Sequence, residues 1–206
     1  APQRTDMLDP LRAMADACED LRLHDRGLVA GIQAALAGLL GRFDPAELEA
    51  KITPQTKLLI LNTPHNPTGG MLKAAELDAI AAILERHPQV WVFADEIYSR
   101  LAYAGAFDSL ASRPGMQART IVSDGASKTW AMTGWRIGYV ANRALAPTFT
   151  RWITNTDSCA SQISQWAALE AITGPQDAAD AMRASFLERR DLIVGLLNTV
   201  PGVACR

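Results

Sequence analysis

The 206-residue chain lacks the features that mark several specialised classes of protein. Its three cysteines are widely spaced and form no C-x-x-C motif, which argues against a disulfide framework and against a zinc site. Its formal net charge is only -2, so charge gives no argument for a nucleic acid or an anionic membrane as a partner. The simplest interpretation is a globular protein with free thiols in a reducing compartment, and we expect no bound metal.

Long hydrophobic runs and targeting signals are also missing. The longest apolar stretch, residues 27–41, is short for a membrane span and contains Gln33, so it predicts a buried helix. The first residues are polar and include Arg4 and Asp6, which is unlike a signal peptide. We therefore expect a cytoplasmic protein that has no membrane partner.

Apolar strands alternate with amphipathic helices along the chain. Short apolar runs predict strands over residues 56–62, 90–94, 120–122 and 137–141. Helical periodicity is found over residues 8–23, 27–40, 73–87 and about 161–200, the last with a break at residues 174–175. A further helix begins with Asp44 as N-cap and Pro45 in its first turn. We expect three tryptophans to lie in the core: Trp130, Trp135 and Trp166. The alternation predicts an α/β fold with a mostly parallel sheet sandwiched by helices.

Four polar segments are expected at one edge of this sheet. They follow or precede the predicted strands, over residues 62–69, 95–98, 123–128 and 134–136. In open α/β sheets, ligands bind outside the carboxyl ends of the strands, so these segments would bring an amide, a carboxylate, a phenol, an amine and a guanidinium to one rim. That set suits a planar, phosphorylated heterocycle with an aldehyde. The amine can form a Schiff base with the aldehyde, the carboxylate can hold a ring nitrogen protonated, and the guanidinium can bind the phosphate.

Four motifs of the sequence resemble a known enzyme family. In chain order they read LLILNTPHNPTGGML, VWVFADEIYSRLAY, SDGASKTWAMTGWRIGY and SQWAALEAI, and they cover most of residues 43–206. They resemble the class I/II aminotransferases, pyridoxal-phosphate enzymes of fold type I, and particularly the bacterial aspartate/aromatic branch. The resemblance implies the large domain of that fold, pyridoxal 5'-phosphate as cofactor, an L-amino acid and a 2-oxo acid as substrates, and a homodimer.

The resemblance also implies roles for individual residues. Lys128 would form the Schiff base with the cofactor and would move the α-proton of the substrate. Asp95 would pair with the ring nitrogen of the cofactor, and Tyr98 together with Asn66 would donate hydrogen bonds to its ring hydroxyl. Transamination would then begin with the exchange of Lys128 for the amino group of the substrate.

Several residues are expected to bind the cofactor phosphate. Arg136 resembles the phosphate-binding arginine of the family, and Ser127 resembles a second phosphate ligand. Many relatives have another serine three residues before the lysine, where this chain has Gly125. The segment LVAGIQAALAGLL resembles the glycine-opened helix whose backbone N–H groups and dipole hold the phosphate. That resemblance places three further residues near the phosphate: Gly31, Ile32 and Gln33.

The chain departs from the family pattern in three places. ALAGLLG runs directly into RFDPAELE, where relatives have several tens of residues that include the aromatic residue stacked on the cofactor ring. The last residues are VPGVACR, where relatives continue into a small domain with the arginine that binds the substrate carboxylate. The usual N-terminal arm is also missing. We therefore expect residues 1–206 to form an incomplete pyridoxal-phosphate-binding large domain, with a chain break or a deletion near residues 41–42.

Two other functions fit parts of the same motifs. Other fold-type-I enzymes, such as C–S lyases, share the cofactor but catalyse a different reaction. A non-catalytic aminotransferase-like sensor or fragment would bind the cofactor without turnover, although the sequence contains no basic DNA-binding helix. The pieces AMTGWRIGY and NPTG favour an aminotransferase, while the preferred amino acid is not indicated by these residues.

Overall fold

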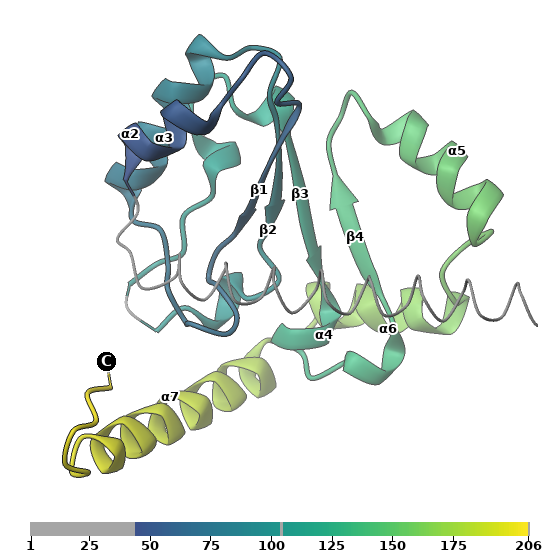
Figure 1. Ribbon diagram of the computed structural model, residues 1–206. Coiled ribbons are helices and arrows are strands. Elements are labelled where there is room, and N and C mark those ends of the chain that lie inside the picture. Colours follow the sequence, from purple (N-terminus) through teal and green to yellow (C-terminus); the bar gives the residue numbers. More distant parts are fainter. Residues whose placement is uncertain (1–43, 104, 206) are drawn as a thin grey trace, which may run out of the picture. The chain divides into compact units, whose positions relative to one another are not determined.

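A four-stranded, mostly parallel sheet forms the centre of the described fold (Figure 1). The computed structural model describes residues 44–103 and 105–205, which belong to one compact unit of the chain. The strands lie in the order β1-β2-β3-β4, with the bounds Leu58–Asn62, Trp91–Asp95, Thr120–Gly125 and Gly138–Ala141. The first three strands are parallel and β4 is antiparallel to β3, which confirms the predicted α/β class.

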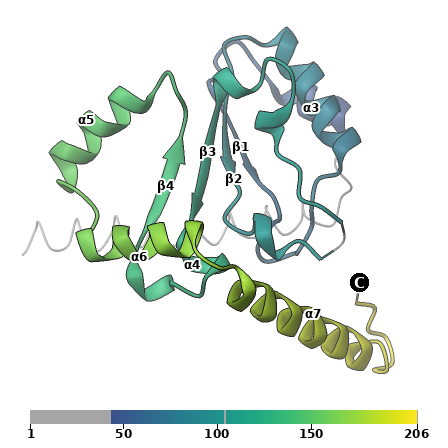
Figure 2. The same cartoon turned by 180° about the vertical axis from the view of Figure 1, so that it is seen from behind.

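Helix α3 (Ala74–Arg86) packs on one face of the sheet. Its buried residues recur at helical spacing: Leu77, Ile80, Ala81, Ile83 and Leu84. Val92 and Ala94, which point to one face of β2, are also buried. Figures 1 and 2 show α2 (Pro45–Lys51) beside α3. The predicted N-cap of α2 is confirmed, because the Asp44 side chain accepts a hydrogen bond from the backbone N–H of Ala46.

The opposite face of the sheet is open within the described residues. Leu58 and Ile60 of β1 lie on it and are 47% and 67% exposed. Phe93 is the register partner of Ile60, so its side chain points to the same face. Parallel sheets normally bury both faces, and the described residues therefore supply only part of the two helical layers.

The carboxyl end of β3 leads directly into the four-residue helix α4 (Ala126–Thr129). Figure 1 shows α4 beyond the end of β3 and close to α6 (Gln162–Thr173). A small apolar cluster joins the two helices, because Ala126 and Met132 are buried against Ala168 of α6. A helix of four residues cannot hold itself in place, so this cluster is part of what fixes α4.

Gly125, the last residue of β3, has no room for a side chain. A Cβ atom at this position would lie 2.9 Å from the Cα of Gly138 and 3.0 Å from the carbonyl oxygen of Ile137. The serine that many relatives carry at this position would therefore not fit between β3 and β4 here. The close approach of the two backbones is therefore compatible with glycine at this position.

The remaining helices lie between and after the strands. They are α5 (Ala146–Thr156), α7 (Asp177–Leu197), η1 (Ser99–Leu101), η2 (Leu110–Ser112), η3 (Gln117–Arg119) and η4 (Thr133–Trp135). The predicted break at residues 174–175 separates α6 from α7 and is confirmed. Helix α5 was not predicted, although Phe149, Trp152 and Ile153 recur in it at helical spacing; none of its residues is buried within the described part of the chain. Among the described helices, none is both long and apolar enough to cross a membrane.

The expectation that three tryptophans lie in the core is wrong for two of them. Trp135 is 45% exposed and Trp166 is 66% exposed. The buried residues of α6 are Ser164 and Ala168, which are four positions apart and share one side of the helix. Trp166 lies midway between them in sequence and therefore points away from that side. The helices predicted over residues 8–23 and 27–40, and the break expected near residues 41–42, lie outside the described residues.

Replacing Gly125 by alanine is expected to lower the free energy of unfolding by about 1–3 kcal/mol, because the new methyl group would force β3 and β4 apart. Gly195→Ala is the matched control. Gly195 lies in α7 with no atom within 4 Å of an added Cβ, so alanine is expected to raise the free energy of unfolding by about 0.5–1 kcal/mol. Chemical denaturation measures both changes. Equal effects of the two substitutions would contradict the close approach of Gly125 and Gly138.

Candidate active site

The parallel register aligns three polar residues at or near the carboxyl ends of neighbouring strands. Asn62 of β1 is the register partner of Asp95 of β2, and Asp95 is the partner of Ser123 of β3. The Asn62 amide nitrogen Nδ2 donates to Asp95 Oδ2 at 3.0 Å and to the Asp95 carbonyl oxygen at 3.3 Å. Asp95 is therefore fixed by the neighbouring strand as well as by its own, at the edge where open α/β sheets bind ligands.

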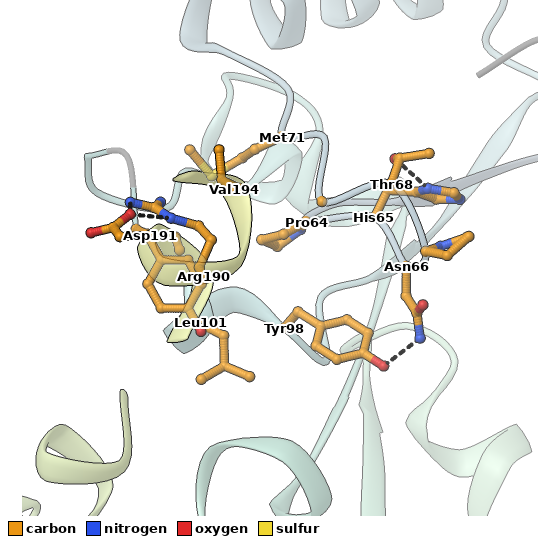
Figure 3. Close-up of a pocket in the computed structure, with 14 residues that line it drawn as sticks. Pro64, His65, Asn66, Thr68, Met71, Tyr98, Leu101, Arg190, Asp191 and Val194 are labelled. Atoms are coloured by element: carbon orange, nitrogen blue, oxygen red, sulfur yellow. Dashed lines mark hydrogen bonds and ion pairs between the residues drawn. The ribbon is translucent and has the colours of Figure 1, made fainter. Parts of the chain in front are cut away.

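Asn62 also fixes the loop that follows β1. Its Oδ1 accepts a hydrogen bond from the backbone N–H of Asn66 at 3.2 Å. The Asn66 Nδ2 donates in turn to the Tyr98 hydroxyl at 2.8 Å, and Figure 3 shows these two side chains pointing toward each other. The structure thus brings together Asn66 and Tyr98. Asn62 was not among the predicted site residues, although its place between a strand and the segment TPHNPTG would have indicated it.

Lys128 lies beside Tyr98. Its Nζ is 5.8 Å from the centroid of the Tyr98 ring, a distance at which a cation and an aromatic ring attract each other. Lys128, Ser127 and Tyr98 line one cavity of about 740 Å³, and Asn66 and Tyr98 line another of about 610 Å³. Both volumes fall within the range of roughly 300–1,000 Å³ that is typical of small-molecule sites. Tyr98 is shared by the two cavities.

Helix α7 contributes to the walls of both cavities. Arg190, Asp191 and Val194 line the smaller one, and Figure 3 shows them across from the loop that carries Asn66. The larger cavity is lined from the same helix by Met182, Phe186 and Arg189. The two cavities therefore combine apolar surface with guanidinium groups, which suits ligands that carry carboxylate or phosphate groups.

Arg136 follows η4 and is bonded to Thr133, which lines the larger cavity. Its side chain is exposed, its Nη1 donates to the Thr133 carbonyl at 3.0 Å, and neither Arg136 nor Asp95 lines the two cavities. Arg136 and Ala131 both have a left-handed backbone, with φ of 52° and 53°, which costs roughly 1–2 kcal/mol for a residue with a Cβ. Strained backbone of this kind is concentrated at functional segments. Gly31, Ile32 and Gln33 lie outside the described residues.

Two carboxyl groups next to the site have raised pKa values. Burial raises the pKa of Asp124, and the hydrogen bond from the Tyr139 hydroxyl at 3.3 Å opposes that shift. Burial also raises the pKa of Glu96, which accepts a hydrogen bond from the Ser109 hydroxyl, and the charge of Asp124 adds to the shift. The charged forms of both groups are disfavoured because they share a partly desolvated region that also contains Asp95.

The polar groups at this edge match the chemistry of pyridoxal phosphate. Lys128 offers a primary amine for the aldehyde, and Asp95 offers a carboxylate for the ring nitrogen. Tyr98 and Asn66 offer two polar groups, already hydrogen-bonded to each other, for the ring hydroxyl. Ser127 adds a hydroxyl close to the amine. The described residues therefore fit the ring and the aldehyde of this cofactor.

Fold and site together define the large-domain architecture of fold-type-I pyridoxal-phosphate enzymes. The family model described as "Aminotransferase class I and II" matches residues 41–206. That match covers most of the chain, and the chain belongs to the class I and II aminotransferase family.

Relatives of known activity and structure match the same part of the chain. The aspartate/prephenate aminotransferase of Cereibacter sphaeroides is 43% identical over 172 residues, which are 80% of this chain and 42% of that protein. The crystal structure of the aspartate aminotransferase from Rhizobium meliloti has a TM-score of 0.76 at 41% identity and covers 80% of this chain and 42% of its own. The aromatic aminotransferase from Pyrococcus horikoshii has a TM-score of 0.73 at 35% identity, over 77% and 43% of the two chains. This chain therefore spans less than half the length of these relatives.

A second family model matches the beginning of the chain. Residues 1–65 match the model described as the C-terminal domain of the type VI secretion system FHA protein, and this match overlaps the aminotransferase match at residues 41–65. Residues 1–40 are matched by the second model alone. Two predictions depend on residues 1–40 and remain predictions. The first is that residues 1–206 form one cofactor-binding domain, and the second is that Gly31, Ile32 and Gln33 contact the phosphate.

Asp124→Asn is expected to stabilise the protein at neutral pH. Because the pKa of Asp124 is higher in the folded protein than in the unfolded chain, its contribution to stability is full at low pH and is lost as the pH rises through the folded-state pKa. Asparagine does not ionise, so the melting temperature of the variant should exceed that of the wild type at pH 7, and the difference should shrink as the pH falls toward 3.8, the ordinary pKa of aspartate. Asp157→Asn, at an exposed position, is the control. A loss of stability in Asp124→Asn that does not depend on pH would contradict this assignment.

Proposed function

We propose that the intact protein is a pyridoxal-phosphate-dependent aminotransferase that moves an amino group between an L-amino acid and a 2-oxo acid. The observation that carries this proposal is the grouping of Lys128, Tyr98 and Asn66 beside Asp95, at the carboxyl ends of parallel strands. The grouping occurs in a chain of the aminotransferase family, and ligands bind at this edge in open α/β sheets.

Asp95, Tyr98 and Asn66 would hold the cofactor ring. The Asp95 carboxylate, fixed by the Asn62 amide, would face the ring nitrogen and keep it protonated. Tyr98 and Asn66 would turn their hydrogen-bonding groups from each other to the ring hydroxyl. When bound, pyridoxal phosphate supplies an electron-withdrawing ring that stabilises negative charge on the substrate α-carbon.

Lys128 would be both the covalent anchor and the base. Its Nζ is the amine that would hold the cofactor through the aldehyde carbon, with water as the leaving group, and it would be free as a primary amine while a substrate amino group takes its place. The freed Nζ would take the proton from the substrate α-carbon, because a general base must lie within hydrogen-bonding reach of the proton that it moves. The position of Lys128 in a cavity shared with Tyr98 supports this role.

Ser127 and Arg136 would bind the phosphate group. The Ser127 hydroxyl is next to Lys128 in the chain and lines the same cavity. Arg136 uses one N–H group in its bond to Thr133, and a guanidinium carries five, so others remain for a phosphate oxygen. Backbone N–H groups at Gly31, Ile32 and Gln33 are proposed as further phosphate donors on the resemblance alone.

The substrates and the assembly belong to the intact protein, because this chain spans less than half of its relatives. The name of the Cereibacter sphaeroides relative supports aspartate as the first amino donor to test. The resemblance supports a cytoplasmic homodimer. A C–S lyase would release a thiol from a sulfur-containing amino acid, and a sensor would release no product, so product analysis separates both alternatives from transamination.

Lys128→Ala is expected to abolish the covalent link to the cofactor. The intact wild-type protein with added pyridoxal phosphate should show a visible absorbance band that borohydride removes, and aspartate should change this band and yield the corresponding 2-oxo acid. The variant should lack the reducible band, and its transamination rate should fall by at least about 100-fold, since it has lost both the amine and the base.

Lys57→Ala is the matched control, because Lys57 is exposed and lies before β1, at the end of the strand away from the candidate site. It should keep both the band and the activity. A reducible band of full strength in Lys128→Ala would contradict the role of Lys128. No band in the folded wild-type protein would contradict the proposed cofactor.

A further inference from the structure

Gln176 joins three parts of the chain through one side-chain amide. It lies directly before α7 and is half-buried. Its Oε1 accepts hydrogen bonds from Arg100 Nη1 at 2.7 Å and from the Trp130 indole Nε1 at 3.0 Å. Its Nε2 donates to the carbonyl oxygens of Ala171 at 2.9 Å and Gly174 at 2.8 Å. All the hydrogen-bonding positions of the amide are therefore used.

These partners fix which way the amide of Gln176 points. Its oxygen faces a guanidinium and an indole N–H, which are both donors, and its nitrogen faces two backbone carbonyls, which are both acceptors. Turning the amide over would place donors against donors and an acceptor against acceptors. The amide therefore has one favourable orientation, and the groups bonded to it are held at fixed positions relative to one another.

The two donors to Gln176 stand next to the residues of the candidate site. Arg100 lies in η1, two residues after Tyr98, and Trp130 is the C-cap of α4, two residues after Lys128. The Arg100 guanidinium also lies over the Trp130 ring, 5.3 Å from its centroid. The three side chains thus form a closed group, which we call the Gln176 group: Arg100, Trp130 and Gln176.

The elements that carry Tyr98 and Lys128 need such an anchor. Helix α4 has four residues and η1 has three, and segments of this length are not stable by themselves. The Gln176 group ties both of them to the α6–α7 turn and, through the Ala171 carbonyl, to the end of α6, where Ala171 packs on the apolar cluster that holds α4. Gln176 is thus linked to the short segments next to both groups, without a hydrogen bond of its own to Lys128 or Tyr98.

We propose that Gln176 is a positioning residue, which holds the Lys128 amine and the Tyr98 phenol in the geometry that the reaction requires. This inference rests on the proposed aminotransferase function. Gln176 contacts no reacting atom, so its loss is expected to act on turnover more than on substrate binding. A displacement of about 1 Å at a reacting group can cost on the order of 100-fold in rate.

Gln176→Met in the intact protein tests the proposal. Methionine keeps the length of the side chain and removes all four hydrogen bonds. We expect kcat to fall by about 10- to 100-fold with KM changed by less than about twofold, while the borohydride-reducible band is retained because Lys128 is still present. The indole N–H resonance of Trp130, identified by its absence in Trp130→Phe, should shift and exchange with solvent faster.

Gln165→Met is the matched control, because Gln165 is exposed on α6 and its side chain makes one hydrogen bond within the described residues, to the Ala160 carbonyl. It should leave kcat and the Trp130 resonance unchanged. Trp130→Phe keeps an aromatic ring for Arg100 and removes one donor to Gln176. Adding it to Gln176→Met should therefore cost less in kcat than the product of the two single effects, because both variants break the same bond.

Three results would decide whether Gln176 is a positioning residue. A fall in kcat together with the altered Trp130 resonance supports the proposal. An altered resonance with kcat equal to that of Gln165→Met overturns it, because the amide would then hold Trp130 without positioning Lys128. If the wild type shows no transamination, the proposed function fails separately, and the ring resonances of Tyr98 still test the positioning: a shift in Gln176→Met supports it and unchanged resonances overturn it.

Discussion

The parallel pairing of β1, β2 and β3 is the constraint on which the candidate site depends. It places Asn62 and Asp95, the last residues of β1 and β2, side by side with Ser123 near the end of β3. A slip of one residue would turn each of these side chains to the other face of the sheet. The Asn62–Asp95 hydrogen bond is possible only in the observed register, and from Asn62 the bonding continues through Asn66 to Tyr98. The geometry of the ring-binding groups thus follows from backbone pairing.

Lys128 is fixed in a different way. It lies on the short helix α4, beyond the paired strands. Side chains from α6 and the α6–α7 turn hold this helix in place by packing and by hydrogen bonding. The close contact of Gly125 with Gly138 determines where the helix leaves β3, and the left-handed backbone of Ala131 determines where the chain turns after it. The site therefore combines a part fixed by strand register with a part fixed by side-chain packing. The second part is more sensitive to single substitutions.

Much of the fold and of the candidate site could be predicted from the sequence. Apolar runs and helical periodicity located the strands and most helices, because burial sets those patterns. The motifs located Asn66, Tyr98 and Lys128, and the structure brings these three together. Helix α5 was missed although its apolar residues recur at helical spacing, and Gln176 was missed because two of its partners, Arg100 and Trp130, are remote in sequence. The bonds of a side-chain amide depend on tertiary contacts that no local pattern encodes.

The proposed function depends on the placement of Lys128 beside Tyr98. The direct test is to identify the lysine that binds the cofactor. The intact protein would be incubated with pyridoxal phosphate, reduced with borohydride, digested and analysed by mass spectrometry. We expect one modified peptide, which contains residues 123–136 or part of them with the added pyridoxyl group on Lys128. Modification of Lys51, Lys57 or Lys73 in place of Lys128 would contradict this placement of the cofactor. Modification of all lysines to a similar extent would also contradict it, because the cofactor would then react without selecting Lys128.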